Sequence, residues 1–168
     1  MIQRTLNRAL MFVLMLAMLP VQQMARAEYD MPYYIEVDIK NQITTVYRTS
    51  DDAVVYQAIC TTGTDEFYTP SGTFYLPKPT DTEREEWFYF RMYGTYAKYA
   101  TRIYKGVLFH SVLYSRKDDS TLSQKSVTEL GTKASHGCIR LRVPDAKWIA
   151  EHCEEGTRVH IFRNGKRD

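Results

Sequence analysis

Apolar residues that alternate with polar ones along the first half of the chain are the strongest constraint on its fold. They occupy every second position from Ile35 to Ile39, and similar β-branched and aromatic runs follow at 43–47 and 53–61. A period of two residues places such side chains on one face of a strand. The joints at 40–41 and 50–52 carry turn residues, which favours a meander or hairpins over crossover helices.

The rest of the chain adds further short strands and two helical segments. Residues 121–130, followed by Gly131, are expected to form a short helix or a helical turn. A clearer helix begins at Pro144, a residue that suits the first helical turn, and ends before Gly156. Further strands are expected at 73–76, after the turn at 69–72, and at 107–113 and 157–162. The predicted fold is mostly β with one or two short helices.

A dense aromatic segment interrupts this pattern between residues 77 and 106. It contains Trp87, Phe88, Tyr89, Phe90, Tyr93, Tyr96, Tyr99 and Tyr104. Aromatic side chains at this density pack into the core of a small β-protein, or they line a binding cleft. We expect them to contribute mainly to the core, with an inserted flap as the alternative.

The first 27 residues resemble an export signal. Arg4 and Arg8 precede an apolar run from Ala9 to Leu19, and Ala25-Arg26-Ala27 offers a small-residue cleavage site. The apolar run is about half of the ~20 residues that a membrane-spanning helix needs, so no stable membrane anchor is expected after cleavage. We predict a signal peptide at 1–27, a single domain at 28–168, and a secreted protein of the periplasm or cell wall.

Charge gives no reason to expect a nucleic-acid partner. The chain has a formal net charge of +2 and lacks a basic run, whereas nucleic-acid binding requires a concentrated basic surface. At 44% hydrophobic and 25% charged residues, the composition also excludes a disordered chain.

Three cysteines, Cys60, Cys138 and Cys153, are present. Thiols of exported proteins tend to pair, and an odd number leaves one over. The residues around Cys138 indicate a reactive thiol rather than a disulfide partner. A bridge between Cys60 and Cys153 is therefore the expected pairing. The alternative is two buried thiols that behave as small hydrophobes.

The segment from Ser135 to Leu141 combines a thiol, an imidazole and a glycine, and carries the chemistry we expect. A cysteine nucleophile needs a base, because a free thiol is mostly protonated at neutral pH. His136 is two residues from Cys138, whereas His110 lies on a separate predicted strand that could place its ring opposite the thiol. Gly137 could turn the backbone so that its N–H and that of Cys138 form an oxyanion hole.

A zinc site is the competing interpretation of the same residues. Its ligands would be His110, His136 and Cys138, with His152 or Cys153 as the fourth. The sequence lacks the paired spacings typical of zinc sites, such as CxxC or HExxH, so no metal and no cofactor are expected.

His110-Ser111, a spacer, and then Ser135-His136-Gly137-Cys138-Ile139-Arg140 resemble the signature of the L,D-transpeptidases with a YkuD-type catalytic domain. The resemblance covers residues 33–162 and includes Gly63, the turn at 69–74 and the helix at 145–149. It implies the L,D-transpeptidase-type β-sandwich or mixed sheet. The spacer is longer than usual for the family, because it holds a polar insert at 115–128, which puts the shape of the cleft in doubt.

The resemblance implies acyl transfer on peptidoglycan stem peptides, with Cys138 as nucleophile and His110 as base. It further implies that Ser111 orients the imidazole, that the N–H groups around His136, Gly137 and Cys138 hold the oxyanion, and that Arg140 binds a substrate carboxylate or braces the loop. The acceptor is an amine in a transpeptidase and water in an L,D-carboxypeptidase. An inert wall-binding module is the remaining alternative. Cell-wall biogenesis and cell shape are the processes that such an enzyme would serve.

Overall fold

The computed structural model describes residues 31–165. The predicted signal peptide at 1–27 and its cleavage site lie outside the described residues. No helix within residues 31–165 is long and apolar enough to cross a bilayer.

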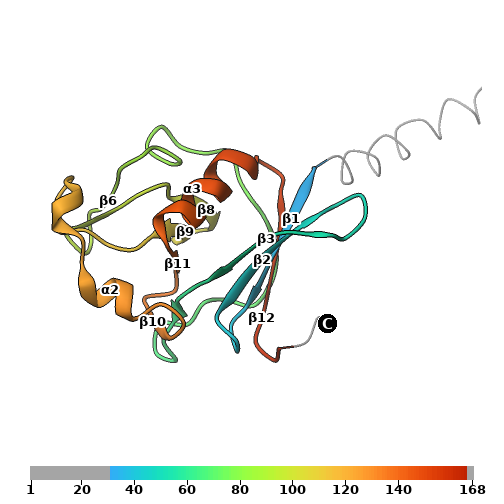
Figure 1. Ribbon diagram of the computed structural model, residues 1–168, viewed down its shortest axis with the longest axis horizontal. Coiled ribbons are helices and arrows are strands. Elements are labelled where there is room, and N and C mark those ends of the chain that lie inside the picture. The colour runs from blue at the N-terminus through green and yellow to red at the C-terminus, as the bar shows by residue number, and fades with distance from the viewer. Residues whose placement is uncertain (1–30, 166–168) are drawn as a thin grey trace, which may run out of the picture. The chain divides into compact units, whose positions relative to one another are not determined.

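A five-stranded sheet forms one layer of the domain (Figure 1). Its order is β3 (Val54–Ile59), β2 (Ile43–Arg48), β1 (Tyr33–Asp38), β12 (Arg158–Phe162) and β5 (Gly72–Tyr75). β1 and β12 are parallel, and the other neighbours are antiparallel. The strands expected from the alternating pattern are therefore present, and the last strand of the chain lies beside the first.

The second layer consists of a three-stranded sheet and a helix. The sheet has the order β11 (Ile139–Leu141), β9 (Val107–Ser111) and β8 (Thr101–Tyr104), and β9 is parallel to β11. Helix α3 (Val143–His152) follows β11 directly and packs on this sheet. Asp145 in its first turn is fully buried, where it accepts hydrogen bonds from Arg142 and from the Tyr56 hydroxyl of β3.

Two small sheets and two short helical segments complete the described chain. β4 (Thr62–Gly63) pairs with β10 (Lys133–Ser135), and β6 (Phe88–Phe90) pairs with β7 (Thr95–Ala97). The helical turn expected at 121–130 is present as α2 (Gln124–Thr128), and the 3-10 turn η1 (Asp119–Thr121) precedes it. α2 and β6 lie on the side remote from the five-stranded sheet (Figure 1).

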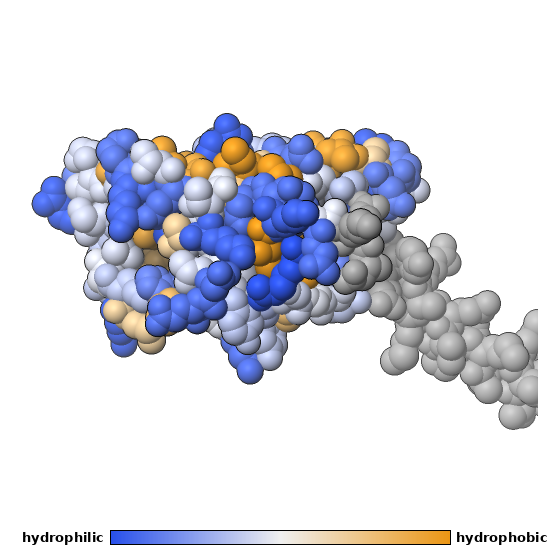
Figure 2. Space-filling model, turned by 90° about the horizontal axis from the view of Figure 1, so that it is seen from below, coloured by the Kyte–Doolittle hydropathy of each residue, from blue (hydrophilic) through white to orange (hydrophobic). Residues whose placement is uncertain are grey.

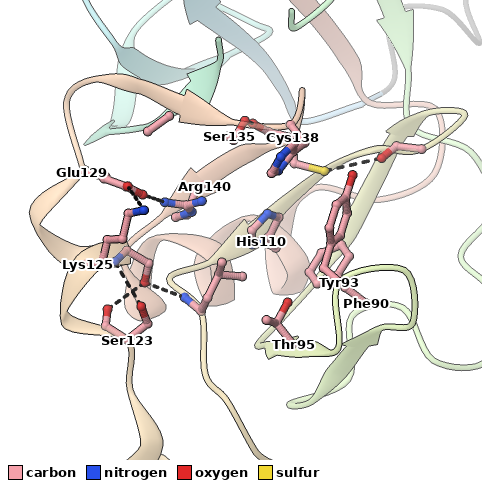
Figure 3. A pocket seen from close by; sticks show the side chains of 15 residues that line it. Phe90, Tyr93, Thr95, His110, Ser123, Lys125, Glu129, Ser135, Cys138 and Arg140 are labelled. Carbon is pink, nitrogen blue, oxygen red and sulfur yellow. Dashed lines mark hydrogen bonds and ion pairs between the residues drawn. The ribbon is translucent and has the colours of Figure 1, made fainter. Parts of the chain in front are cut away.

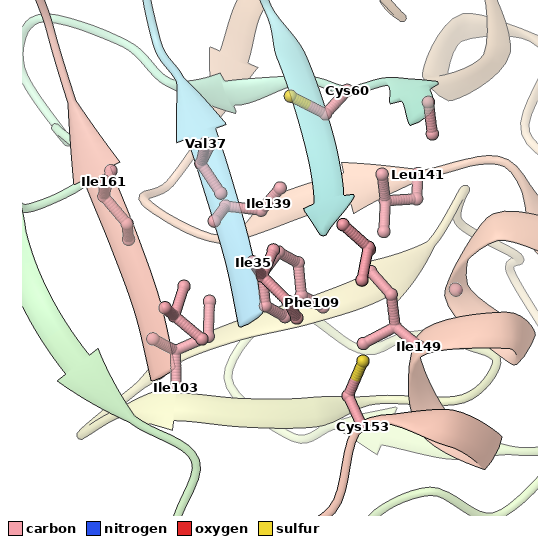
Figure 4. Packing of buried hydrophobic residues seen from close by; sticks show 14 of the residues in the cluster. Ile35, Val37, Cys60, Ile103, Phe109, Ile139, Leu141, Ile149, Cys153 and Ile161 are labelled. Carbon is pink, nitrogen blue, oxygen red and sulfur yellow. The ribbon is translucent and has the colours of Figure 1, made fainter. Parts of the chain in front are cut away.

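The core lies between the two layers. Ile35, Val37 and Ile161 from the large sheet meet Phe109 and Ile139 from the small one (Figure 4). Burial of such side chains from water is the main stabilising contribution to a domain of this size. Figure 2 shows one face on which hydrophilic residues predominate and apolar ones form limited patches. The mostly β architecture with short helices is thus confirmed.

Two expectations about the interior are corrected. Cys60 and Cys153 are free thiols, both fully buried, and no bridge joins them. Figure 4 shows their sulfurs at opposite ends of the drawn cluster, with the side chains of Ile35 and Phe109 between those ends. They therefore follow the alternative interpretation, as small hydrophobes of the core.

The aromatic segment does not fill the core either. Trp87, Phe88, Phe90 and Tyr96 are half-buried, and Tyr89, Tyr93 and Tyr104 are exposed. Only Tyr99 of this group packs against the core cluster. Most of the segment forms the β6–β7 hairpin and its flanks, which corresponds to the flap.

Candidate active site

The pairing of β9 with β11 brings the two halves of the sequence motif together. His110 on β9 is the register partner of Arg140 on β11. Cys138 precedes Arg140 by two residues, so the period of an extended chain directs both side chains to the same face. The strand that supplies the imidazole is thus the neighbour of the segment that supplies the thiol.

These residues line a pocket of about 320 Å³. His110, Cys138 and Arg140 lie at its centre (Figure 3). One wall is the hairpin, which contributes Phe90, Tyr93 and Thr95, and the opposite wall is formed by Ser123, Lys125 and Ser126 at α2. The insert at 115–128 therefore shapes the cleft, as its length suggested.

The His110 imidazole is buried and fixed in one tautomer. It is 4% exposed, and its Nδ1 lies 2.6 Å from the Ser111 carbonyl oxygen. Because a carbonyl can only accept, Nδ1 carries the proton, and Nε2 of the neutral ring keeps its lone pair. Burial lowers the pKa of His110 to about 4, opposed by the Ser111 hydrogen bond and assisted by the charge of Arg140. The ring is neutral at physiological pH.

Ser111 orients His110 through its backbone rather than its hydroxyl. The Ser111 side chain is fully buried on the other side of β9, where its Oγ donates to the Val112 carbonyl and accepts from the Lys98 N–H. Successive side chains of a strand point to opposite faces. The hydroxyl therefore cannot share the face of the imidazole, and the carbonyl takes its place.

The Cys138 thiol is partly open to the pocket but surrounded by protein atoms on its other sides. Its Sγ lies 3.4 Å from the Gly106 carbonyl oxygen, to which the thiol donates. Desolvation raises the pKa of Cys138, while a hydrogen bond from the Leu108 backbone and the charges of Arg140 and Arg102 lower it. With desolvation dominant, the resting thiol is protonated.

The Ser135 side chain makes two hydrogen bonds to the backbone of the turn around Gly137 and Cys138. Ser135 Oγ donates to the Cys138 carbonyl at 2.6 Å and accepts the Gly137 N–H at 3.1 Å. Gly137 has φ +107°, a conformation that favours glycine. The N–H of Gly137, one of the two amides that we expected to point into an oxyanion hole, is therefore bound within the turn.

Arg140 is buried in the pocket wall and ion-paired. It is 5% exposed, its Nη1 donates to Glu129 at 2.7 Å, and its buried Nε has no hydrogen-bond partner. A buried, ion-paired Arg140 fits bracing of the loop better than the other expected role, binding of a substrate carboxylate.

His136 is exposed at the pocket rim. Its ring stacks on Tyr93 at a centroid distance of 4.9 Å and contacts Phe67 at the same distance. His136 therefore joins the tip of the hairpin to the loop after β4, whereas His110 is the histidine that shares the buried centre of the pocket with Cys138.

The sequence did not indicate a role for the Thr69 hydroxyl or for Lys98. Thr69 belongs to the turn at 69–74 that forms part of the family resemblance, and Lys98 lies within the stretch 77–106 that contains the aromatic segment. Their partners lie far along the chain: the Thr69 hydroxyl donates to the Gly137 carbonyl, and the Lys98 ammonium pairs with Asp119. Sequence spacing offers no signal for such contacts.

A thiol and an imidazole base held in one tautomer thus line the same pocket, an arrangement suited to acyl transfer. The family model of the L,D-transpeptidase catalytic domain, YkuD, matches residues 32–161. The protein YciB of Bacillus subtilis (strain 168), which is named as a candidate L,D-transpeptidase, is 38% identical over 133 residues, covering 76% of this chain and 64% of YciB.

Solved structures agree on the fold. An L,D-transpeptidase from Mycobacterium smegmatis superimposes with a TM-score of 0.61 at 24% identity, covering 78% of this chain and 58% of that chain. L,D-transpeptidase 3 from Mycobacterium tuberculosis, in complex with a faropenem-derived adduct, gives 0.58 at 21% identity, covering 77% and 60%. The chain spans less than two thirds of the length of each of these three relatives. It belongs to the YkuD family of L,D-transpeptidase catalytic domains.

Proposed function

We propose that this protein is a cysteine-dependent L,D-transpeptidase that acts on the stem peptides of bacterial peptidoglycan. One observation carries the proposal: the Cys138 thiol and the His110 imidazole line the same pocket, and the Ser111 carbonyl holds Nδ1 so that Nε2 can accept a proton. Membership of the family supplies the class of substrate.

In the first half-reaction, Cys138 Sγ attacks the carbonyl of the L-to-D peptide bond of a tetrapeptide stem. The thiol proton passes to His110 Nε2, and the imidazolium returns it to the nitrogen of the terminal D-amino acid, which leaves as the thioester forms. In the second, an amine of another stem attacks the thioester. The amine proton passes through His110 to Sγ, and the thiol is regenerated.

The resting pair is neutral in this scheme. Burial raises the pKa of Cys138 and lowers that of His110, so both changes oppose a thiolate–imidazolium pair before substrate binds. The proton therefore moves as the carbon–sulfur bond forms. Negative charge then develops on the substrate carbonyl oxygen, where loss of one hydrogen-bond donor typically lowers the rate by about 10²–10³-fold.

We assign the oxyanion donors to the backbone N–H groups of Cys138 and His136. The Gly137 N–H is bound to Ser135 Oγ, so Gly137 serves through its conformation and not as a donor. Arg140, with Nη1 committed to Glu129, would attract a substrate carboxylate through its charge while bracing the wall. Thiol, imidazole and amides suffice for this chemistry, so the proposal includes no cofactor.

The proposal also includes export. The predicted signal peptide at 1–27 would deliver the domain to the periplasm or cell wall, where its substrate lies. Muropeptide analysis of cells with and without the active protein would then reveal new cross-links, wall-attached protein or trimmed stems, which also identifies the acceptor.

Covalent labelling by a carbapenem tests the assignment of the nucleophile, since a structural relative is described in complex with the carbapenem imipenem. Intact-mass spectrometry should show one adduct on the wild-type protein and none on Cys138→Ala. The matched variant Cys60→Ala, which removes a buried thiol of the core, should still be labelled. D-amino-acid exchange on a tetrapeptide should follow the same pattern. Labelling of Cys138→Ala, or a wild-type protein without exchange activity, would contradict the proposal.

A further inference from the structure

Thr69 lies beneath the turn that carries Cys138 and is 1% exposed. It belongs to the loop between β4 and β5, and its Oγ1 accepts the Gly63 N–H at 2.8 Å. The same hydroxyl lies 2.9 Å from the Gly137 carbonyl. A carbonyl only accepts, so the single hydroxyl proton of Thr69 is donated to Gly137.

The Gly137 carbonyl belongs to the same peptide group as the Cys138 N–H. This group is planar and trans, since no cis peptide bond occurs among the described residues. In a trans peptide the C=O and N–H point in opposite directions. A hydrogen bond that fixes the carbonyl toward Thr69 therefore fixes the Cys138 N–H toward the opposite side.

Cys138 and His136 line the pocket, whereas Thr69 lies outside its lining. Ser135 holds the two neighbouring polar groups of the turn, the Gly137 N–H and the Cys138 carbonyl, but it leaves the orientation of the peptide between them to Thr69. We propose that Thr69 is a positioning residue that aims the Cys138 N–H at the developing oxyanion. This inference rests on the proposed function.

Thr69 is itself held firmly enough for this role. Arg163 Nη2 donates to the Thr69 carbonyl at 2.7 Å, and Arg163 Nε donates to Ser71 Oγ at 2.8 Å. On the other side the loop closes over Gly63, where a Cβ would lie 2.0 Å from the Phe67 carbonyl oxygen and 2.7 Å from the Thr69 nitrogen. The loop therefore packs directly against the Gly63 backbone, in space that the Cβ of any other residue would occupy.

Thr69→Val tests the inference because it keeps the shape of the side chain and removes only the hydroxyl. We expect kcat/KM for D-amino-acid exchange, and the rate of carbapenem acylation, to fall about tenfold to a hundredfold, somewhat less than the loss of an oxyanion donor outright. Thr69→Ser keeps the hydroxyl and should recover most of the rate. Thr45→Val is the matched control, since it removes a buried, hydrogen-bonded hydroxyl on β2 that does not line the pocket.

Alkylation of Cys138 by iodoacetamide separates positioning from simple damage. This reaction displaces iodide and develops no oxyanion, so Thr69→Val should be alkylated at the wild-type rate while acylation is slowed. An equal loss of both rates would mean that the thiol itself has moved, and would overturn the inference. A rate of carbapenem acylation in Thr69→Val equal to that of the wild type would also overturn the inference. A wild-type protein inactive in exchange and acylation would instead overturn the proposed function.

Discussion

At the scale of single residues, the site shows how burial selects the charge state of a catalytic pair. His110 is held as a neutral base because its ring is enclosed, and one carbonyl decides which nitrogen is free. Arg140 adds a positive charge that opposes protonation of His110 and favours the Cys138 thiolate. The same environment thus disfavours a thiolate–imidazolium pair at rest, because burial outweighs the effect of Arg140 on the thiol.

Burial of a neutral histidine predicts a loss of stability in acid. The pKa of His110 is lowered to about 4 in the folded protein from an ordinary 6.5. Between these values the unfolded chain binds a proton that the native protein does not, so stability is present above pH 6.5 and is lost as the pH falls toward 4. The full effect is about 3 kcal/mol.

Urea unfolding of the wild type and of His110→Gln, at pH 7 and pH 4.5, measures this effect. The variant lacks the titrating ring, so the wild type should lose about 2–3 kcal/mol more than the variant between the two pH values. All other titrating groups are common to both proteins and cancel in the comparison. Equal losses would show that His110 can be protonated inside the fold.

At the scale of elements, the sequence predicted the strands and helices whose positions depend on local residue patterns. Alternation located the strands of the large sheet, and Pro144 marked the helix after Cys138. Composition alone favours the core for the aromatic segment. It indicates that the rings will be removed from water, but it does not indicate whether they pack in the core or in the wall of a pocket. Pairing of β6 with β7 instead directs Phe90 and Tyr93 to the pocket. The motif located Ser135, Cys138 and His110, whereas the Thr69 hydroxyl acts through a hydrogen bond to Gly137 that only the folded chain reveals.

The two walls of the pocket are joined by one buried lysine. Lys98 follows β7, and its Nζ lies 3.0 Å from Glu86 at the base of the hairpin and 2.6 Å from Asp119 in η1. The ammonium also lies 4.3 Å from the centre of the Trp87 ring. A charge shared between two carboxylates and an aromatic face fixes the hairpin relative to the insert.

Lys98→Met should widen the cleft without unfolding the domain. Methionine fills similar space, and the released partners are already 57% and 72% exposed, so no buried charge is left unpaired. We expect the KM for a tetrapeptide to rise about fivefold to tenfold, corresponding to about 1 kcal/mol of lost binding, with kcat within about twofold of wild type. Lys147→Met, which removes a lysine paired with Glu151 on α3, is the control and should behave as wild type. An unchanged KM in Lys98→Met would exclude this link between the walls.

At the scale of the whole molecule, the three thiols divide between core and pocket. Cys60 and Cys153 are fully buried, and desolvation raises the pKa of each to about 12. Cys138 alone among them lines the pocket. The domain therefore holds its two layers together by packing around these sulfurs, with no covalent link between the strand region of Cys60 and the end of α3.

This division predicts two distinct classes of thiol in solution. Because reaction requires an accessible thiolate, one equivalent of a disulfide reagent such as DTNB should react with the native protein, and three after denaturation. The native reaction should disappear in Cys138→Ala. A reductant should leave the melting temperature unchanged, because no bridge is present to be cleaved. A denatured protein with one reactive thiol, and a melting temperature that falls on reduction, would instead establish the bridge between Cys60 and Cys153. Packing alone would then not account for the cohesion of the two layers.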